Sequence, residues 1–363
     1  MQDALAITTT IAFLLLLGLL ASWTARKLRI PDGLLLLIIG IVAARISYKQ
    51  IPLIQFPEVF LHSLAILGLT MVAFDSAARL RFRELDTSHR NAARLAFANA
   101  LFMLVFFTAA AKYLLGESWL NSLLMAALLI GTSAEHGLPR LESMISTPLA
   151  VVLPFIALSL IQLGATLPFA LNIVIGIGTG IFAGVILFKL IQHSHEKTYS
   201  PLVLILAGLL SYVLAERLGG SGVLAAGALG LFLGNVYAKQ KITLLDGRLG
   251  NALTILAFIL AGLLVDIPYS IAFFITSGIL FAAYIALRFI AALISMKQGI
   301  HEMVYMTLNA PKGSATAVVL FALLAYPIEG LNTILSTAFA IMAYSLILSF
   351  ITNLAVRHEN STR

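Results

Sequence analysis

Two stretches of this 363-residue chain decide the fold: LLIGTSAEHGLPRL at residues 128–141 and TLNAPKGSATAVV at residues 307–319. Each is an apolar segment interrupted near its centre by Gly or Pro together with ionisable side chains. In a bilayer, such a break frees backbone N–H and C=O groups that protein, ions or water must satisfy. We interpret both stretches as discontinuous membrane helices whose breaks form a binding site. The alternative is that Gly131 and Pro311 are ordinary kinks, because Gly and Pro are common in membrane helices.

The composition of the whole chain agrees with a membrane protein. Hydrophobic residues make up 60% of the chain, charged residues only 11%, and the mean hydropathy is +1.01, whereas soluble domains carry about 25% charge. The net charge is +7. In so apolar a chain, an excess of basic residues indicates which loops lie in the cytoplasm, and nucleic acid is not an expected partner. The chain has no Cys, which excludes disulfides, thiolate metal sites and a Cys nucleophile. We expect an all-α integral membrane protein without a soluble domain, cofactor or resident metal.

Apolar stretches separated by charge, Pro or Gly predict about thirteen transmembrane helices. Their ranges are Leu5–Trp23, Leu34–Ala44, Val59–Ala78, Leu95–Leu115, Trp119–His136, Leu149–Leu167, Ile173–Ile191, Leu202–Leu214, Val223–Val236, Leu253–Val265, Ile271–Ile294, Met303–Leu324 and Leu331–Leu354. No basic region precedes the first range, so we expect it to be a retained span and not a signal peptide. Alternate loops hold seventeen Lys and Arg on one side and four on the other. This bias predicts a multi-pass protein of the cell membrane with its N-terminus outside and its C-terminus in the cytoplasm.

The two interrupted segments are the fifth and the twelfth, seven segments apart. A shift by seven also pairs the first segment with the eighth and the sixth with the thirteenth, and an odd shift reverses the direction through the membrane. This layout predicts an inverted repeat: a first six-helix unit at residues 1–170, a linker helix at 171–195 and a second six-helix unit at 196–363. In transporters built this way, interrupted helices cross near the midplane and form the substrate site.

Ionisable residues inside apolar segments are costly and tend to be functional. Glu135 follows the first break directly, where it could cap the next half-helix or alternate between a proton and a monovalent cation. For its neighbour His136 we expect a supporting hydrogen bond, and Asn309 is expected to support the second break in the same way. Asp75 could line a cytoplasmic funnel or simply pair with Arg79 one turn away.

Two basic residues also lie inside apolar segments. Arg288 is within about three turns of Lys297, so we expect its side chain to reach towards the cytoplasmic surface. Lys312 lies within the second break, where an unpaired ammonium is improbable. We therefore expect a carboxylate partner for Lys312, either Glu142 or Glu135.

Hydroxyl groups gather after the first break. Thr132, Ser133, Ser143, Ser146 and Thr147 could ligate a dehydrated cation or could satisfy the helix backbone. No segment carries a hydrolase or metalloprotease signature, so an intramembrane enzyme is the least favoured class.

The order of motifs resembles the monovalent cation:proton antiporter superfamily, the sodium/proton and potassium/proton exchangers, over nearly the whole chain. RIPDGLLLLIIGIVAAR (29–45) is similar to the second span of that family, VAFDSAARLRFREL (72–85) to its third, GGSGVLAAGALGLFLGN (219–235) to a glycine-rich span, and NAPKGSATAVVLFAL (309–323) to its second broken span. GTSA (131–134) stands in place of a Thr-Asp-Pro crossing, and ESMISTPL (142–149) resembles a Glu-Ser motif followed by Asn-Asp.

The resemblance implies roles for individual residues. Thr132, Ser143 and Asp75 match positions that line the cation path, and Glu142 matches the acid that pairs with the basic residue of the broken helix, here Lys312. The chain departs from the family where Ser146 and Thr147 replace Asn-Asp and where Ser133 replaces the crossing aspartate. Thr132 and Glu142 are also only ten residues apart, so either the second half of the fifth span is very short or ESMIST only resembles the motif.

Three functional hypotheses remain open. The first, implied by the resemblance, is exchange of Na⁺ or K⁺ for protons by a homodimer. We expect this exchange to be electroneutral because the family aspartates are missing. The second is a proton- or sodium-coupled carrier of an anion or organic solute, with Lys312 attracting the negative charge. The third is a homologue that no longer transports. Whether a carboxylate neutralises Lys312 separates the first two.

Overall fold

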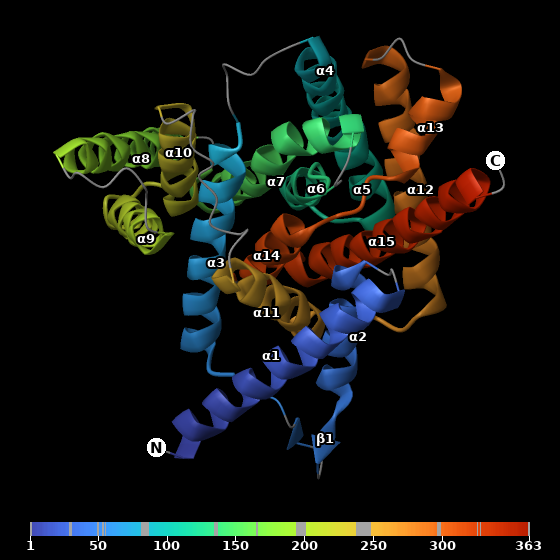
Figure 1. The fold of residues 1–363 in the computed structure, drawn as a ribbon, viewed down its shortest axis with the longest axis horizontal. Coiled ribbons are helices and arrows are strands. Elements are labelled where there is room, and N and C mark those ends of the chain that lie inside the picture. Colours follow the sequence, from blue (N-terminus) through green and yellow to red (C-terminus); the bar gives the residue numbers. More distant parts are fainter. Residues whose placement is uncertain are drawn as a thin grey trace.

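The structure, a computed structural model, describes residues 2–28, 31–48, 51–52, 54, 56–80, 87–133, 137–164, 166–193, 201–236, 248–295, 299–324, 326 and 328–361. These residues form a helical bundle (Figure 1). The helices are α1 (Gln2–Leu28), α2 (Asp32–Arg45), α3 (Glu58–Ala78), α4 (Thr87–Phe102), the π-helix η2 (Met103–Phe107), α5 (Thr108–Leu115), α6 (Trp119–Leu128), α7 (Gly137–Leu163), α8 (Leu167–His193), α9 (Pro201–Arg217), α10 (Gly222–Val236), α11 (Arg248–Leu264), α12 (Ile271–Ser295), α13 (Ile300–Leu308), α14 (Ser314–Leu323) and α15 (Leu331–Ser361). Two short antiparallel strands, β1 (Ser47–Tyr48) and β2 (Ile51–Pro52), follow α2.

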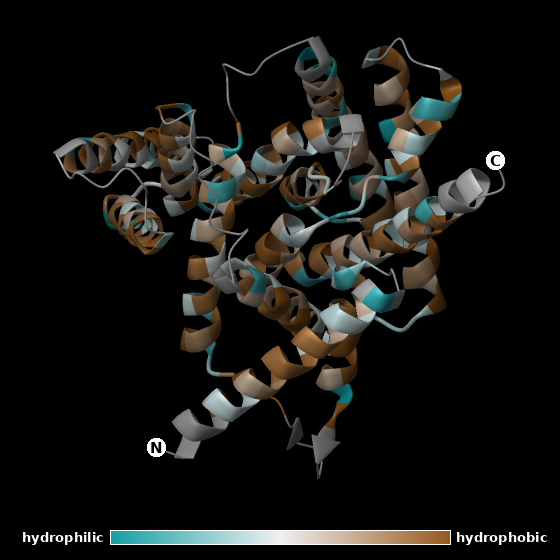
Figure 2. Ribbon diagram, viewed as in Figure 1, coloured by the Kyte–Doolittle hydropathy of each residue, from teal (hydrophilic) through white to brown (hydrophobic). Residues whose placement is uncertain are grey.

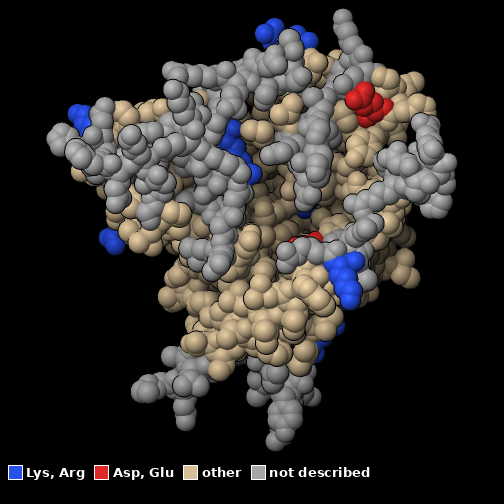
Figure 3. All heavy atoms as spheres, in the orientation of Figure 1, with Lys and Arg blue, Asp and Glu red and all other residues tan. Residues whose placement is uncertain are grey.

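The helices match the predicted apolar segments. Within the described residues, seven helical stretches are long and apolar enough to cross a membrane, and four shorter helices are similarly apolar. Figure 2 shows how hydrophobic residues dominate almost every helix, and Figure 3 shows a face of the molecule on which charged side chains are sparse. The prediction of an all-α membrane protein is therefore confirmed.

Local sequence explains where several helices begin and end. Pro31 and Pro57 precede α2 and α3, positions where the missing N–H of proline has no consequence. The Ser118 side chain accepts a hydrogen bond from the Asn121 N–H and so caps α6. α5 ends at Gly116 in the left-handed conformation, φ +72°, which glycine adopts without steric cost.

Several helix pairs pack backbone against backbone through glycine. A Cβ at Gly230 of α10 would meet the Phe74 carbonyl oxygen of α3 at 2.2 Å. A Cβ at Gly40 of α2 would meet the Ile259 carbonyl oxygen of α11 at the same distance. Small residues permit this approach because membrane helices associate by close packing. The third predicted segment is thus tightly joined to the ninth, and the second to the tenth.

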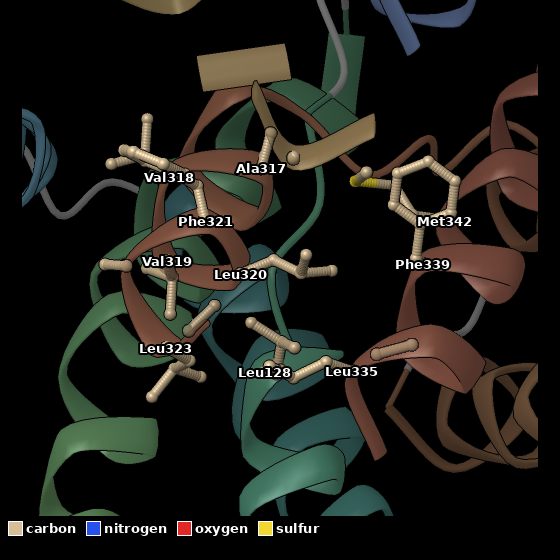
Figure 4. Packing of buried hydrophobic residues seen from close by; sticks show 14 of the residues in the cluster. Leu128, Ala317, Val318, Val319, Leu320, Phe321, Leu323, Leu335, Phe339 and Met342 are labelled. Carbon is tan, nitrogen blue, oxygen red and sulfur yellow. The ribbon is translucent and has the colours of Figure 1, made fainter. Parts of the chain in front are cut away.

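The second broken segment runs through the middle of the hydrophobic core. Every residue of α14 from Thr316 to Leu323 is buried. Figure 4 shows Leu320 and Leu323 of α14 packed with Leu128 of α6 and with Leu335 of α15. The half-helix that follows the second break is consequently packed inside the hydrophobic core.

Candidate functional site

The first break lies between α6 and α7. α6 ends at Leu128, residues 129–133 are not helical, and α7 begins at Gly137. Only residues 134–136 separate the described part of the break from α7. The returning half of the fifth segment is therefore very short or missing, and Glu142 lies in the second turn of α7 itself. Glu135 and His136 lie outside the described residues.

The second break lies between α13 and α14. α13 ends at Leu308, and α14 begins at Ser314. Pro311 has no N–H to donate, and the Lys312 N–H donates to the Ser345 hydroxyl of α15 at 3.1 Å. Side chains of α15 therefore satisfy backbone groups that the break frees.

The two breaks cross each other. The Ser133 N–H donates a hydrogen bond of 2.8 Å to the Pro311 carbonyl oxygen. Gly313 lies so close that a Cβ there would be 2.2 Å from the Cβ of Ser133. The predicted crossing of Gly131–Glu135 with Asn309–Gly313 is thus confirmed for the described part of the first break.

Lys312 ties the two breaks together. Its side chain is fully buried, and its Nζ donates to the carbonyl oxygens of Leu129 and Gly131, the latter at 2.8 Å. Nζ also lies 4.3 Å from the centroid of the Tyr284 ring, a distance at which the negative face of an aromatic ring attracts a cation. Backbone dipoles and an aromatic ring therefore surround this ammonium.

The predicted ion pair between Lys312 and Glu142 is wrong. Glu142 binds Arg288 instead, through bonds of 2.9 Å from Nη1 to Oε1 and 2.7 Å from Nη2 to Oε2. The planar guanidinium matches both carboxylate oxygens at once, which an ammonium cannot do. Both side chains are buried, at 0% and 1% exposure.

This pairing also corrects the expectation for Arg288. Its side chain does not reach the surface, because it lies on the buried face of α12 and bridges that helix to α7. A signal was present in the sequence: Ser277, Tyr284 and Arg288 recur at helical spacing with Leu280 and Ala291, all of them buried. Such a polar stripe in an apolar helix indicates a face directed at the protein interior.

A hydroxyl cluster surrounds the first break. Thr132 Oγ1 and Ser146 Oγ lie 3.1 Å apart, and the Thr147 hydroxyl donates to the Thr132 carbonyl oxygen at 3.1 Å. Thr132 and Ser146 are buried, whereas Ser133 is exposed. The structure thus brings together three of the predicted residues, Thr132 from the break and Ser146 and Thr147 from α7. Ser143 also lies on α7.

The remaining predicted residues lie on other elements. Asp75 is buried on α3 at 1% exposure, and its Oδ2 accepts from Arg79 at 2.7 and 2.9 Å. The ion pair with Arg79, one of the two interpretations of Asp75, is therefore present. At the end of α13, Asn309 Oδ1 accepts from the Ser349 hydroxyl at 2.7 Å, and Nδ2 donates to the Tyr305 hydroxyl at 2.8 Å. Asn309 thus joins the second break to α15.

A membrane helix bundle with two crossed, interrupted helices beside buried charges defines a secondary transporter of the discontinuous-helix class. The sequence profile of the family described as sodium/hydrogen exchanger, transmembrane, matches residues 11–356. The chain belongs to this family of membrane transporters.

Known proteins similar to this chain agree with the family. It is 28% identical over 260 residues to the K⁺/H⁺ antiporter NhaP2 of Shewanella sp. strain MR-4, covering 65% of this chain and 45% of that protein. It is 26% identical over 281 residues to the K⁺/H⁺ antiporter NhaP of Alkalimonas amylolytica, covering 70% and 49%. The chain thus spans less than half the length of these relatives. The structure of the sodium proton antiporter MjNhaP1 from Methanocaldococcus jannaschii at pH 8 superimposes with a TM-score of 0.75 at 19% identity, covering 96% of this chain and 97% of that one, which shows a common fold.

Proposed function

We propose that this protein exchanges a monovalent cation, Na⁺ or K⁺, for protons across a membrane. The observation that carries the proposal is the crossing of the two breaks, joined by the bond from Ser133 to Pro311. Crossed breaks place free backbone groups and polar side chains where a transported ion can be held inside the bilayer. Family membership and the antiporters among the similar proteins support the same activity.

The cation site that we propose is built from oxygen atoms beside the first break. Thr132, Ser146 and Thr147 already contact one another, and Ser133 and Ser143 lie on the same two segments. Hydroxyl and carbonyl oxygens suit hard cations. The proton would be carried by Glu135, for which cation and proton compete, and Asp75 would attract cations towards the site.

Exchange is proposed to be electroneutral. Glu142 is held by Arg288, so the ion pair removes one buried carboxylate from the cycle. Glu135, the one carboxylate that we place beside the first break, then carries one cation in one direction and one proton in the other, so no net charge moves. Purified protein on a solid-supported membrane should then give no transport current while an internal dye reports proton movement.

The repeat boundaries, the outside N-terminus and a homodimer belong to the same proposal. Glycine-mediated packing of the third segment on the ninth and of the second on the tenth supports the repeat. In the predicted repeat, the third segment corresponds to the tenth and the second segment to the ninth. The contact between the third and ninth segments therefore corresponds to the contact between the tenth and second, as an inverted repeat requires.

Flux in sealed proteoliposomes tests the proposal. An outward Na⁺ or K⁺ gradient should drive protons inward and acidify the lumen, and Glu135→Gln should abolish this movement without altering the melting temperature. Gly178→Ala provides a control, because a Cβ at that position has no neighbour within 4 Å. The absence of cation-dependent proton movement with every alkali cation would contradict exchange.

One observation favours a second candidate, a coupled carrier of an anion. Around the crossing, the described residues place two fully buried basic side chains, Lys312 and Arg288, with one carboxylate, Glu142. The surplus positive charge would attract an anionic solute. Uptake driven by a proton or sodium gradient in the presence of an organic acid, but not in its absence, would favour this alternative.

A further inference from the structure

The loop between α14 and α15 is anchored to the two broken segments. Lys312, just before α14, donates to carbonyl oxygens of the first break. In the loop itself, the Glu329 carbonyl oxygen accepts a hydrogen bond of 2.9 Å from Asn121 Nδ2 of α6. A Cβ at Gly330, the next residue, would lie 2.8 Å from the same Asn121 nitrogen. The broken segments and this loop therefore form one group of connected elements, which we call the crossing group.

The helices α8, α9 and α10 form a second group. They pack on one another and lie together in Figure 1. A Cβ at Gly180 of α8 would meet the Ala225 carbonyl oxygen of α10 at 2.2 Å. Glu216, near the end of α9, accepts a hydrogen bond of 2.8 Å from the N–H of Gly222, where α10 begins. Because α10 also packs closely on α3, α3 belongs to this second group, which we call the flanking group.

Two tyrosines connect the flanking group to the crossing group. Tyr212 of α9 is only 5% exposed, and a Cβ at Gly222 would lie 2.7 Å from its ring. The Tyr212 hydroxyl is hydrogen-bonded to the hydroxyl of Tyr326, which lies in the loop between α14 and α15 and packs against the same hydrophobic cluster. Buried tyrosine hydroxyls usually have such a partner. Here the partner comes from the other group.

Other contacts between the two groups are apolar. A Cβ at Gly68 of α3 would lie 3.1 Å from Val318 Cγ1 of α14, and a Cβ at Gly227 of α10 would lie 3.8 Å from Val152 Cγ2 of α7. Apolar contacts have no preferred direction, so such surfaces can shift along each other at little cost. A hydrogen bond, in contrast, requires a defined distance and angle. The tyrosine pair therefore favours one relative position of the two groups.

The tyrosine pair lies at one end of the boundary between the groups. The turn after α9 follows the eighth predicted segment, and the loop after α14 follows the twelfth. With the N-terminus outside, as we propose, both lie on the outer side of the membrane. Transporters with crossed, interrupted helices open their site to one side at a time by moving one group of helices against another. A bond between the groups at the outer end opposes opening to the outside.

We propose that the hydrogen bond between Tyr212 and Tyr326 is the outer gate of the protein. While the bond is intact, the loop after α14 stays against α9 and the crossing is closed to the outside. When the bond breaks, the loop moves away from α9 together with the broken segments. The inference rests on the proposed exchange function for what passes the gate, but opening of the gate can be measured without transport.

Thiol labelling measures how often the gate opens. The chain has no Cys, so Val223→Cys introduces a single thiol. Val223 lies in the first turn of α10, is 1% exposed and belongs to the same buried cluster as Tyr212, so a water-soluble maleimide should reach it when the gate opens. Adding Tyr326→Phe should raise the labelling rate in detergent about fivefold, the change in population that a hydrogen bond of average strength produces. Tyr113→Phe, at a tyrosine that is 79% exposed, should leave the rate unchanged. Equal labelling rates in the two backgrounds would overturn the gate.

Cross-linking tests whether the gate must open during exchange. A bis-methanethiosulfonate reagent can join the thiols of Tyr212→Cys and Tyr326→Cys across the boundary. The link should stop cation-dependent proton movement in proteoliposomes until a reductant cleaves it. The matched control joins Asn121→Cys to Glu329→Cys, two positions within the crossing group, and should leave exchange unchanged.

The outcomes of the cross-linking experiment separate the gate from the exchange function. If the protein linked between positions 212 and 326 exchanges as fast as its reduced form, the two groups do not separate there and the gate is overturned. Absence of exchange in the wild type with every alkali cation would instead contradict the proposed function. The labelling rates would then still decide whether the tyrosine pair opens.

Discussion

Arg288 and Lys312 are both buried cations near the crossing, yet the protein stabilises them in different ways. Arg288 has a carboxylate, Glu142, bound through two parallel hydrogen bonds. Lys312 has two carbonyl oxygens of the first break and the face of Tyr284. In the same helix bundle, a carboxylate therefore stabilises the charge of Arg288, and backbone dipoles stabilise the charge of Lys312.

The difference shows what a broken helix contributes. In a continuous helix the carbonyls of Leu129 and Gly131 would accept backbone N–H groups, whereas here they accept an ammonium. Within the described residues, the carbonyl oxygens of an interrupted helix thus accept hydrogen bonds from a buried ammonium that forms no direct salt bridge with a carboxylate. Each of the following substitutions changes one of these two environments.

Removing the anion from the Arg288 environment should have the largest effect. Glu142→Gln leaves a buried guanidinium without a counter-charge, which we expect to cost about 3–5 kcal/mol of unfolding free energy. The double substitution Glu142→Leu with Arg288→Met removes both charges and should recover most of that loss. Unfolding in detergent, followed by tryptophan fluorescence, measures both. If Glu142→Gln is as stable as the wild type, the pair is not a buried salt bridge.

Removing the cation from the Lys312 environment should cost less. Lys312→Met nearly keeps the length of the side chain but leaves two carbonyl oxygens without a donor, at about 1 kcal/mol for each, the lower end of the cost of an unpaired buried group. Because no carboxylate among the described residues is left unbalanced, the loss should be smaller than in Glu142→Gln. The ratio of Na⁺ to K⁺ exchange rates should not change. A loss larger than that of Glu142→Gln would show that Lys312 balances a charge and not only dipoles.

Moving the two breaks apart tests whether their geometry creates the dipole environment. Gly313→Ala places a methyl group 2.2 Å from the Cβ of Ser133, so the crossing must shift, at about 1–3 kcal/mol. Adding Ser133→Gly removes the opposing atoms and should restore stability. Gly278→Ala is the matched control, since a Cβ there meets no atom within 4 Å. Equal melting temperatures for Gly313→Ala and Gly278→Ala would mean that the breaks do not cross as closely as the structure shows.

The sequence predicted the breaks but not the partners of the charges. Gly131, Pro311 and the ionisable residues beside them mark where helices are interrupted, because these signals are local. The pairing of Glu142 with Arg288 joins residues 146 positions apart and depends on which faces of α7 and α12 meet. Because Lys297 follows Arg288 closely in the sequence, we expected the Arg288 side chain to reach the surface. The packing of α12 on α7 excludes that position.

Substitutions in the hydroxyl cluster of Thr132, Ser146 and Thr147 should have the smallest effect on stability. Ser146→Ala removes the 3.1 Å contact with Thr132, and Thr147→Val removes the bond to the Thr132 carbonyl. Each neutral hydrogen bond contributes about 1 kcal/mol, so both variants should fold normally. If these oxygens hold the transported cation, each variant should raise the cation concentration needed for half-maximal exchange, while Thr108→Val, a buried hydroxyl outside the crossing, should not. Unchanged cation dependence in both variants would place the cation site nearer to the carbonyls that now bind Lys312, and exchange would then require Lys312 to leave them.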